Sequence, residues 1–224
     1  MDAIERYIRY LNTEAKQYNG IVEKPARDST IEKFISIAKE NNTSKQKARD
    51  LIVSALNEDR RVLCWSDHHF NHDMLWKKGM RDFSSREEMN NLMLNALCAI
   101  KPDDVVLFGG DLCFYNFKDI LAEINKVKCQ KIYVVGNHDI RDNALLNSLR
   151  SSFEAVTISF DFQHEPSFGD KNILVSHYPV AASHLLDNEI NLHGHTHQHL
   201  MGIKHLNMCV EHTGYKLKEL REFF

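Results

Sequence analysis

Residues 104–139 read DVVLFGGDLCFYNFKDILAEINKVKCQKIYVVGNHD, with two short apolar runs on either side of an amphipathic segment. The runs DVVLFGG and KIYVVGN have the length and composition of buried strands. The segment near Asn116 to Lys128 has apolar residues at helical spacing and predicts a helix between them. This stretch therefore predicts strand, helix and strand in β-α-β order.

The same order begins further towards the N-terminus. RVLCWS at residues 61–66 predicts another strand, and a helix is predicted near Ser85 to Ile100. Ser85 and Glu88 have the spacing of a capping box at the start of this helix. One face of the helix is apolar and comprises Met89, Leu92, Met93, Ala96, Leu97 and Ile100. Residues 61–137 thus predict β-α-β-α-β order.

Four more strand-like runs follow with little helix between them, namely AVTISFDF, NILVSH, INLHGH and LNMCVEH. They predict a β-rich layer in the second half of the chain. Alternating strands and helices followed by this layer indicate an α/β fold, and we expect one domain over residues 61–224.

Residues 1–60 have a different pattern and predict a helical extension. Apolar residues recur at helical spacing in two segments, at Ile31, Phe34, Ile35 and Ala38 and again at Ala48, Leu51, Ile52, Ala55 and Leu56. The residues from Asn41 to Ser44 separate the two helices as cap and turn residues. Two short helices also resemble a helix-turn-helix, but the segment holds 11 basic and 10 acidic residues, which favours a packing unit over a nucleic-acid-binding one.

The composition is that of a globular protein. Of the 224 residues, 43% are hydrophobic and 26% are charged, and the net charge of -3 gives no basic surface for non-specific binding to nucleic acid. No apolar run has the length of a membrane span, and MDAIERYIRY lacks the apolar segment of a secretory signal. We therefore expect a cytoplasmic protein that does not bind membranes. No pattern in the sequence indicates an oligomeric state.

Polar side chains follow the predicted strands at the points where these strands end. Listed by cluster, they are Asp67, His68 and His69; Asp111; Asn137, His138 and Asp139; His177; and His195 and His197. The carboxyl ends of strands in an α/β sheet lie along one rim, so these clusters should converge on one site. Carboxylates, several imidazoles and an amide are costly to bury unpaired, and a metal centre would offset that cost. Mixed nitrogen and oxygen ligands suit Mn, Fe, Zn or Ni, of which we expect Mn.

Five motifs occur in order: Asp67-x-His69, Gly110-Asp111, Gly136-Asn137-His138-Asp139, Ser176-His177 and Gly194-His195-Thr196-His197. This set resembles the motif set of calcineurin-like metallophosphoesterases, over roughly residues 61–213. SDHHFNH, followed by Arg81 and Phe83, looks most like small bacterial and bacteriophage members. The resemblance implies a four-layer α/β/β/α sandwich and a phosphoesterase that uses two divalent metal ions.

The resemblance also implies a role for each motif residue. One ion would take Asp67, His69, Asp111 and His197, and the other would take Asp111, Asn137, His177 and His195, so that Asp111 bridges both. A bridging hydroxide would attack phosphorus in line. His138 would be the general acid at the leaving group, with Asp139 orienting its ring.

Further residues near these motifs are candidates for substrate binding. Asn137, His68 and His72 could contact the phosphate, although the two histidines could equally line the entrance. Arg81 and Arg141 could clamp a phosphate through their guanidinium groups, although an exposed arginine is more often only solvated.

The spacing between the motifs leaves little room for a cap over the site, which predicts an open site for small, accessible phosphate esters. We expect a phosphohydrolase that acts on nucleotides. The alternative is a phosphodiesterase or nuclease that acts on nucleic acid or cyclic nucleotides. A binding scaffold without activity is a further alternative, but such a protein would lack ligands or His138, and all of them are present.

Overall fold

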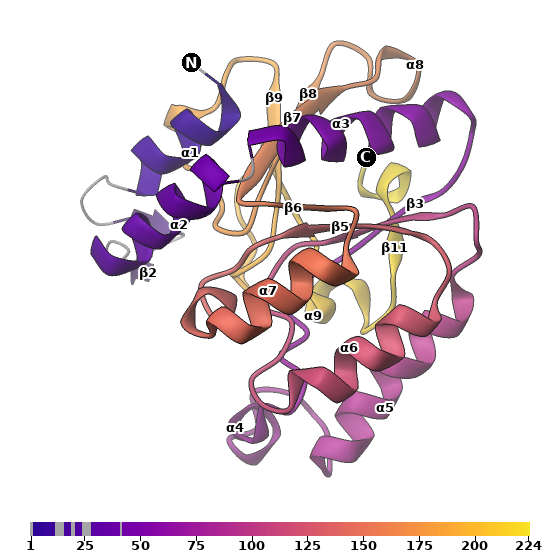
Figure 1. Ribbon diagram of the computed structural model, residues 1–224. Coiled ribbons are helices and arrows are strands. Elements are labelled where there is room, and N and C mark those ends of the chain that lie inside the picture. The colour runs from indigo at the N-terminus through magenta and orange to yellow at the C-terminus, as the bar shows by residue number, and fades with distance from the viewer. Residues whose placement is uncertain (1, 12–15, 19–20, 24–27, 41) are drawn as a thin grey trace.

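Two β-sheets stacked face to face, with helices outside them, make up the described part of the chain (Figure 1). The computed structural model describes residues 2–11, 16–18, 21–23, 28–40 and 42–224. One sheet has five strands in the order β11-β3-β4-β5-β6, and the other has four in the order β10-β9-β8-β7. The α/β class and the predicted layered arrangement are therefore confirmed.

The five-stranded sheet contains the predicted β-α-β-α-β segment. Its strands β3 (Val62–Trp65), β4 (Val105–Phe108), β5 (Gln130–Val134) and β6 (Ala155–Thr157) are parallel, and β11 (Lys218–Glu219) pairs antiparallel with β3. Helices α5 (Arg86–Ala96), α6 (Phe117–Lys126) and α7 (Asn143–Ser152) lie together below this sheet in Figure 1. Ser85 is the N-cap of α5, as its spacing to Glu88 predicts, because its hydroxyl accepts the Glu88 N–H at 3.1 Å.

The four-stranded sheet consists of β7 (Ser159–Gln163), β8 (Asn172–Ser176), β9 (Glu189–His193) and β10 (His205–Asn207). Strands β8, β9 and β10 are parallel, and β7 runs antiparallel to β8. Two predicted runs differ from the structure. AVTISFDF is not one strand, because the chain leaves the first sheet after Thr157 and enters the second at Ser159. LNMCVEH is a strand only in its first residues, and α9 (Val210–Thr213) follows.

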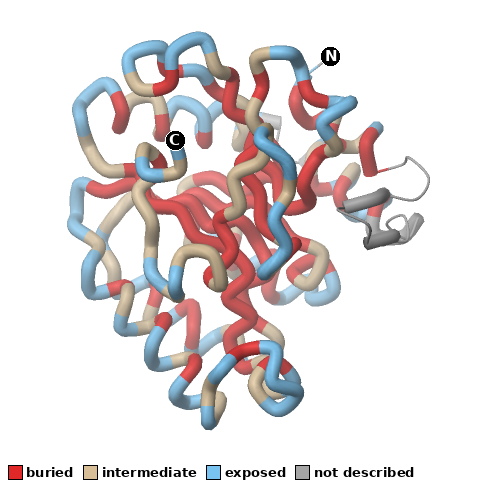
Figure 2. Tube along the Cα trace, turned by 180° about the vertical axis from the view of Figure 1, so that it is seen from behind, coloured by how far each residue is buried: buried red, intermediate tan, exposed pale blue. Residues whose placement is uncertain are grey.

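Alternate residues of the strands pack into two different cores. Leu63 and Trp65 of β3 face the helices, whereas Val62 and Cys64 face the second sheet. On the other side of that inner core, β8 contributes Ile173 and Val175. Both sheets are therefore buried where they meet, and the buried tube segments cross the centre of the molecule in Figure 2.

The N-terminal segment forms α1 (Ala3–Leu11), a hairpin of β1 (Lys16–Tyr18) and β2 (Ile21–Glu23), α2 (Asp28–Glu40) and α3 (Asn42–Asn57). The two predicted helices are confirmed as α2 and α3. Asn41 lies outside the described residues, and the expectation of cap and turn residues up to Ser44 is wrong, because α3 already begins at Asn42. Helix α1 contacts β7 and α2. Helix α3 contacts β6 and β7, and its Ala48, Ile52 and Ala55 belong to the core between the sheets.

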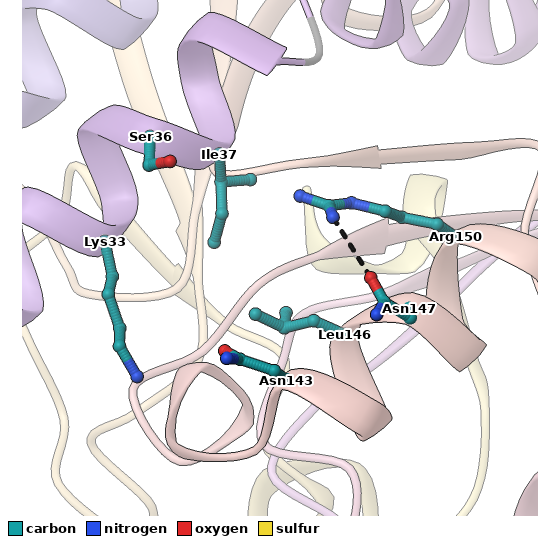
Figure 3. A pocket seen from close by; sticks show the side chains of 7 residues that line it. All are labelled: Lys33, Ser36, Ile37, Asn143, Leu146, Asn147 and Arg150. Atoms are coloured by element: carbon teal, nitrogen blue, oxygen red, sulfur yellow. Dashed lines mark hydrogen bonds between the residues drawn. The ribbon is translucent and has the colours of Figure 1, made fainter.

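Short elements complete the described fold: α4 (Asp73–Lys77), η1 (Leu97–Ala99), η2 (Asp139–Arg141), α8 (Glu165–Phe168), η3 (Ala182–His184) and η4 (Leu220–Phe223). A hollow of about 330 Å³ separates α2 from α7, where Lys33 and Ile37 face Leu146 and Asn147 (Figure 3). The Lys33 ammonium donates to the Ile140 carbonyl at 2.7 Å, so α2 is tied to η2. Among the described residues, no helix combines the length and apolar character that crossing a bilayer requires.

Ile52→Ala is expected to lower the free energy of unfolding by about 2–5 kcal/mol. Ile52 is fully buried and packs in the core cluster to which both sheets contribute, so the shorter side chain would leave a cavity. Chemical denaturation of the full chain measures the change. Arg49→Ala, at an exposed position on the same helix, is the control and should stay within about 0.5 kcal/mol of the original protein. An equal, small effect of both substitutions would show that α3 is not part of the core.

Candidate metal centre

Two groups of side chains that could each hold a metal ion lie at the carboxyl ends of the strands. In the described part of the chain they are Asp67, His69 and His197, and Asp111, His177 and His195. Within each group the ligand atoms all lie within 4.8 Å of one another. Because strand ends of both sheets reach the same edge, residues up to 130 positions apart in the sequence meet here.

The Asp67 carboxylate has one oxygen fixed by the protein and one that is unpartnered. Its Oδ2 accepts hydrogen bonds from the His195 N–H at 2.8 Å and from the Ser66 hydroxyl at 2.5 Å. Its Oδ1 is buried without a hydrogen-bond partner and lies 3.8 Å from His69 Nε2. A buried carboxylate oxygen without a partner is costly, and a cation between it and the imidazole would remove that cost. This part of the site fits a metal ion.

Asp111 belongs to the second group and also lies close to the first. Its Oδ2 is 3.4 Å from His177 Nε2 and 3.8 Å from His69 Nε2, one histidine from each group. Its Oδ1 accepts the backbone N–H of His138 at 2.8 Å, which fixes the carboxylate. Asn137 Oδ1 is 3.1 Å from His177 Nε2 and so lies with the second group. Asp111 Oδ2 has the position that a ligand shared by two ions would need.

The carboxylates of the site attract positive charge. Burial by itself raises the pKa of Asp111, but the facing imidazoles of His177 and His69 outweigh it and hold that pKa well below its usual value. Burial by itself lowers the pKa of His177, but Asp111 and Asp67 raise it to about 10. The site therefore has an electrostatic preference for cations. The His177 Nδ1 bonds the Gly109 carbonyl at 2.8 Å, which leaves Nε2 as the ligand atom.

Five of the candidate ligands have a left-handed backbone, which is rare for residues with a Cβ. Their φ angles are 58° for Asp67, 49° for His69, 54° for Asp111, 68° for His195 and 48° for His197. Such conformations cost on the order of 1–3 kcal/mol each and cluster at functional sites. Their clustering at these strand ends indicates a functional site.

Two glycines allow the ligand loops to approach each other. A Cβ at Gly136 would collide with the Asp111 carboxylate, and it would lie 2.7 Å from the Asp111 backbone nitrogen. A Cβ at Gly194 would collide with the Asp67 carboxylate and the Ser66 hydroxyl. Both positions therefore need glycine because of the space that a neighbouring carboxylate occupies.

Arg81 supports the site from inside the protein, which corrects the expectation that it clamps a phosphate. Its side chain is fully buried, and its guanidinium donates to the Asp67 carbonyl at 2.6 Å and the His68 carbonyl at 2.7 Å. It also forms an ion pair with Glu211 at 2.7 Å. These contacts use the guanidinium to hold the backbone of a candidate ligand in place.

Glu211 contacts a candidate ligand, and the sequence did not reveal this. Its carboxylate contacts His197 Nδ1 at 2.9 Å, which leaves Nε2 of that ring as the ligand atom. Burial by itself raises the pKa of Glu211, but His197 and Arg81 lower it to about 2. Glu211 belongs to α9, in the run that was predicted to be a strand, and no motif spacing points to it.

His68 lies in the hydrophobic core, which corrects the expectation that it lines the entrance or binds phosphate. The side chain is fully buried, and its ring centroid is 4.2 Å from that of Trp65 and 5.6 Å from those of Phe70 and Phe108. Burial lowers the pKa of His68 to about 3, so the ring is neutral. It packs between the five-stranded sheet and its helices, away from solvent.

Asp139 holds two loops together and has no contact with the His138 ring among the described hydrogen bonds. Its carboxylate accepts the backbone N–H groups of Gly136, Asp111 and Leu112 at 2.7, 2.9 and 3.1 Å, and the Tyr133 hydroxyl at 2.9 Å. The expected orienting role is therefore corrected, because these bonds engage both oxygens. The His138 Nε2 lies 4.0 Å from Asp111 Oδ2.

Two further substrate-binding candidates, His72 and Arg141, lie at the edge of the site. The ring of His72 is half-buried, with its centroid 5.8 Å from that of His69 and 4.1 Å from that of Phe114. Arg141 is exposed and lines a small pocket together with His138. Both remain candidates for contacts with a substrate.

Glu211→Gln is expected to weaken divalent-metal binding about 10- to 100-fold, the usual effect of removing a carboxylate behind a histidine ligand. The neutral amide oxygen can still accept the His197 Nδ1–H, but it lacks the negative charge that polarises this ring and pairs with Arg81. Titration calorimetry with Mn²⁺ on the metal-free protein measures the affinity. Glu222→Gln, at an exposed position, is the control and should bind Mn²⁺ normally. Equal affinities of the two variants would show that the contact between Glu211 and His197 does not support the site.

Known proteins resemble this chain in the region that holds the candidate ligands. Residues 61–211 match the family model described as calcineurin-like phosphoesterase superfamily domain. An uncharacterised protein of Methanocaldococcus jannaschii is 34% identical over 83 residues, which are 36% of this chain and 47% of that protein. The chain thus spans about half the length of this relative. The crystal structure of a protein of unknown function from Aquifex aeolicus aligns with a TM-score of 0.56 and 26% identity, over 72% of this chain and 96% of that one.

Proposed function

The chain belongs to the calcineurin-like phosphoesterase superfamily, whose members hydrolyse phosphoesters with metal ions, and we propose that it cleaves small phosphate esters, with nucleotides as substrates. The position of Asp111 carries the proposal. One oxygen of this buried carboxylate lies within 4.0 Å of His69, His177 and His138, so both candidate ligand groups and the proposed acid meet at one point. An ester bound there would be within reach of all three.

The proposed centre holds two divalent ions, with Mn²⁺ as the first choice. The ligands of one would be Asp67, His69, Asp111 and His197, and those of the other Asp111, Asn137, His177 and His195. When bound, the ions would lower the pKa of a coordinated water and neutralise charge on the phosphoryl oxygens. The protein's part is to hold the ligands rigidly, which the bonds to Asp67 Oδ2, Asp111 Oδ1 and His177 Nδ1 support.

His138 is the proposed general acid. Its backbone N–H is fixed by Asp111 Oδ1, and its side chain is 25% exposed, so the ring stands between the buried carboxylate and solvent. A leaving alkoxide is strongly basic, and a proton from the imidazole would stabilise it as the ester bond breaks. The proton would come from a ring nitrogen of His138 and pass to the ester oxygen.

The openness of the site supports small esters as substrates. The His197 side chain is 32% exposed and that of His138 is 25% exposed, so a ligand can reach both from solvent. Between Asp67 and Asp111 the chain forms only the short elements α4 and η1, helix α5 and strand β4. In this described region no separate cap covers the ligands.

Hydrolysis assays with added Mn²⁺ test the proposal. The substrates are mononucleotides, cyclic nucleotides, bis-p-nitrophenyl phosphate and single-stranded DNA, and metal analysis confirms that the protein is loaded. The expected result is phosphate release from mononucleotides. Cleavage of cyclic nucleotides or DNA alone would replace the proposal with a phosphodiesterase, and loaded protein that cleaves none of the four would refute hydrolysis of these esters.

A further inference from the structure

A pocket of about 170 Å³ lies directly beside His138. It is lined by the loop after β4, the start of α6 and the turn that leads into α7. The lining residues are Cys113, Phe114, Phe117, His138, Arg141, Asp142 and Leu145. The His138 imidazole, whose Nε2 lies 4.0 Å from Asp111 Oδ2, thus also lines this pocket. If an ester were bound over Asp111 with its leaving group towards His138, the leaving group would lie next to this pocket.

The pocket has an aromatic wall and a cationic rim. The half-buried ring of Phe114 has its centroid 5.5 Å from that of His138, and Phe117 and the buried Leu145 add apolar surface. Arg141 is exposed, and none of the ion pairs of the described residues engages its guanidinium. Flat aromatic rings and guanidinium groups both stack on nucleobases, whereas a sugar phosphate offers no flat apolar face.

The other polar groups of the pocket are occupied within the protein. The Asp142 carboxylate caps α7 by accepting the Ala144 N–H at 2.8 Å, and the Cys113 thiol contacts the Tyr115 carbonyl at 2.8 Å. The pocket side chains that remain to contact a ligand are Phe114, Phe117, Arg141 and His138. A volume of about 170 Å³ is smaller than the 300–1,000 Å³ of pockets that enclose a whole ligand, so it suits one ring system of a larger ligand.

We infer that this pocket is the leaving-group subsite and that it selects esters whose leaving group carries an aromatic base, that is, nucleoside esters. The inference rests on the proposed function, since it concerns the ester that His138 would protonate. The base would lie against Phe114 with Arg141 at the rim, while the phosphate would lie over Asp111. Phe114 is then a specificity-determining residue, and its contact with the base would contribute to binding more than to the chemical step.

The test compares two esters that share the same bond, 2′-deoxyadenosine 5′-phosphate and 2-deoxyribose 5-phosphate, of which only the first has a base. The original protein should favour the nucleotide about 5- to 150-fold in kcat/KM, the range expected for stacking of one base. Phe114→Ala should reduce this ratio by most of that factor, chiefly through KM for the nucleotide. Phe114→Tyr keeps an aromatic face and should retain the ratio.

Phe224→Ala is the control, because Phe224 is also aromatic, is 51% exposed, packs against Phe168 and does not line the pocket. It should leave the ratio unchanged. A ratio near one in the original protein, or the same ratio after Phe114→Ala, would overturn the inference. Thermal melting of each variant shows whether it is folded.

Binding of adenosine, measured by calorimetry, tests the pocket without hydrolysis. We expect binding that Phe114→Ala weakens and Phe224→Ala does not. If neither ester is cleaved by metal-loaded protein but adenosine binds in this Phe114-dependent way, the proposed function fails while the base-binding pocket stands. If the esters are cleaved but adenosine binding does not depend on Phe114, the function stands and the inference is wrong.

Discussion

Asp111→Asn is expected to lower kcat/KM more than about 100-fold and to reduce the number of bound metal ions below that of the original protein. The substitution replaces a charged carboxylate with an amide of the same shape. The single oxygen of the amide can still accept the His138 N–H. The NH₂ group then takes the place of Oδ2 and faces His69 and His177. An NH₂ group is no metal ligand. Removing a group that only supports a ligand costs 10- to 100-fold, so losing a shared ligand should cost more.

The measurements are metal content after purification with Mn²⁺ and the hydrolysis rate on a nucleotide. Asp119→Asn is the matched control, because Asp119 is exposed on α6 and should tolerate the change. His69→Ala should have a smaller effect than Asp111→Asn, because His69 belongs to one group only. An Asp111→Asn protein that retains two ions and activity within tenfold of the original would exclude a shared ligand.

Much of the fold could be predicted because its elements have clear local patterns. Apolar runs of strand length alternate with amphipathic helices between residues 61 and 137, and the structure follows that order. The convergence of the polar clusters could also be predicted, since strand ends of a parallel sheet share one edge. Local pattern failed at Ile158, where one strand-like run passes from one sheet to the other. Both segments are buried, so hydropathy gives no sign of the break.

The roles of residues around the ligands were harder to predict, because they depend on partners distant in sequence. Arg81 was expected to face a phosphate, but Glu211 and two backbone carbonyls surround it. Asp139 was expected to touch the neighbouring ring, but the amides of Asp111 and Gly136 enclose its carboxylate. A sequence motif specifies that a charged group is needed, whereas the direction of its side chain is set by the backbone around it.

Residues 1–60 contact the loops that carry the candidate ligands. The buried Tyr7 hydroxyl accepts the N–H of Tyr178 at 3.0 Å, directly after His177. The ring centroid of Tyr178 in turn lies 4.1 Å from that of His195. Lys33 binds the Ile140 carbonyl, two residues after His138. The helical extension therefore supports the same strand ends that bring the ligands together, a role that its near-neutral charge alone could not indicate.

His138→Ala is expected to lower kcat on a nucleoside 5′-phosphate by on the order of 10²–10⁴-fold, the usual contribution of general acid catalysis. The leaving alkoxide of this ester is strongly basic and needs a proton as the bond to phosphorus breaks. The leaving group of p-nitrophenyl phosphate is a weak base and departs without one, so the same variant should lose clearly less activity on the aryl ester.

The dependence on the leaving group separates proton donation from electrostatic support. If His138 only stabilised the phosphate through its charge, both esters would lose activity alike, since both have the same phosphoryl group. Metal content must be measured alongside, because the His138 N–H bonds Asp111 and Nε2 lies 4.0 Å from the shared oxygen. The backbone bond persists in alanine, so the metal content should not change. Equal losses on the two esters at unchanged metal content would remove His138 from the acid role, and the Asp111-centred site would still stand.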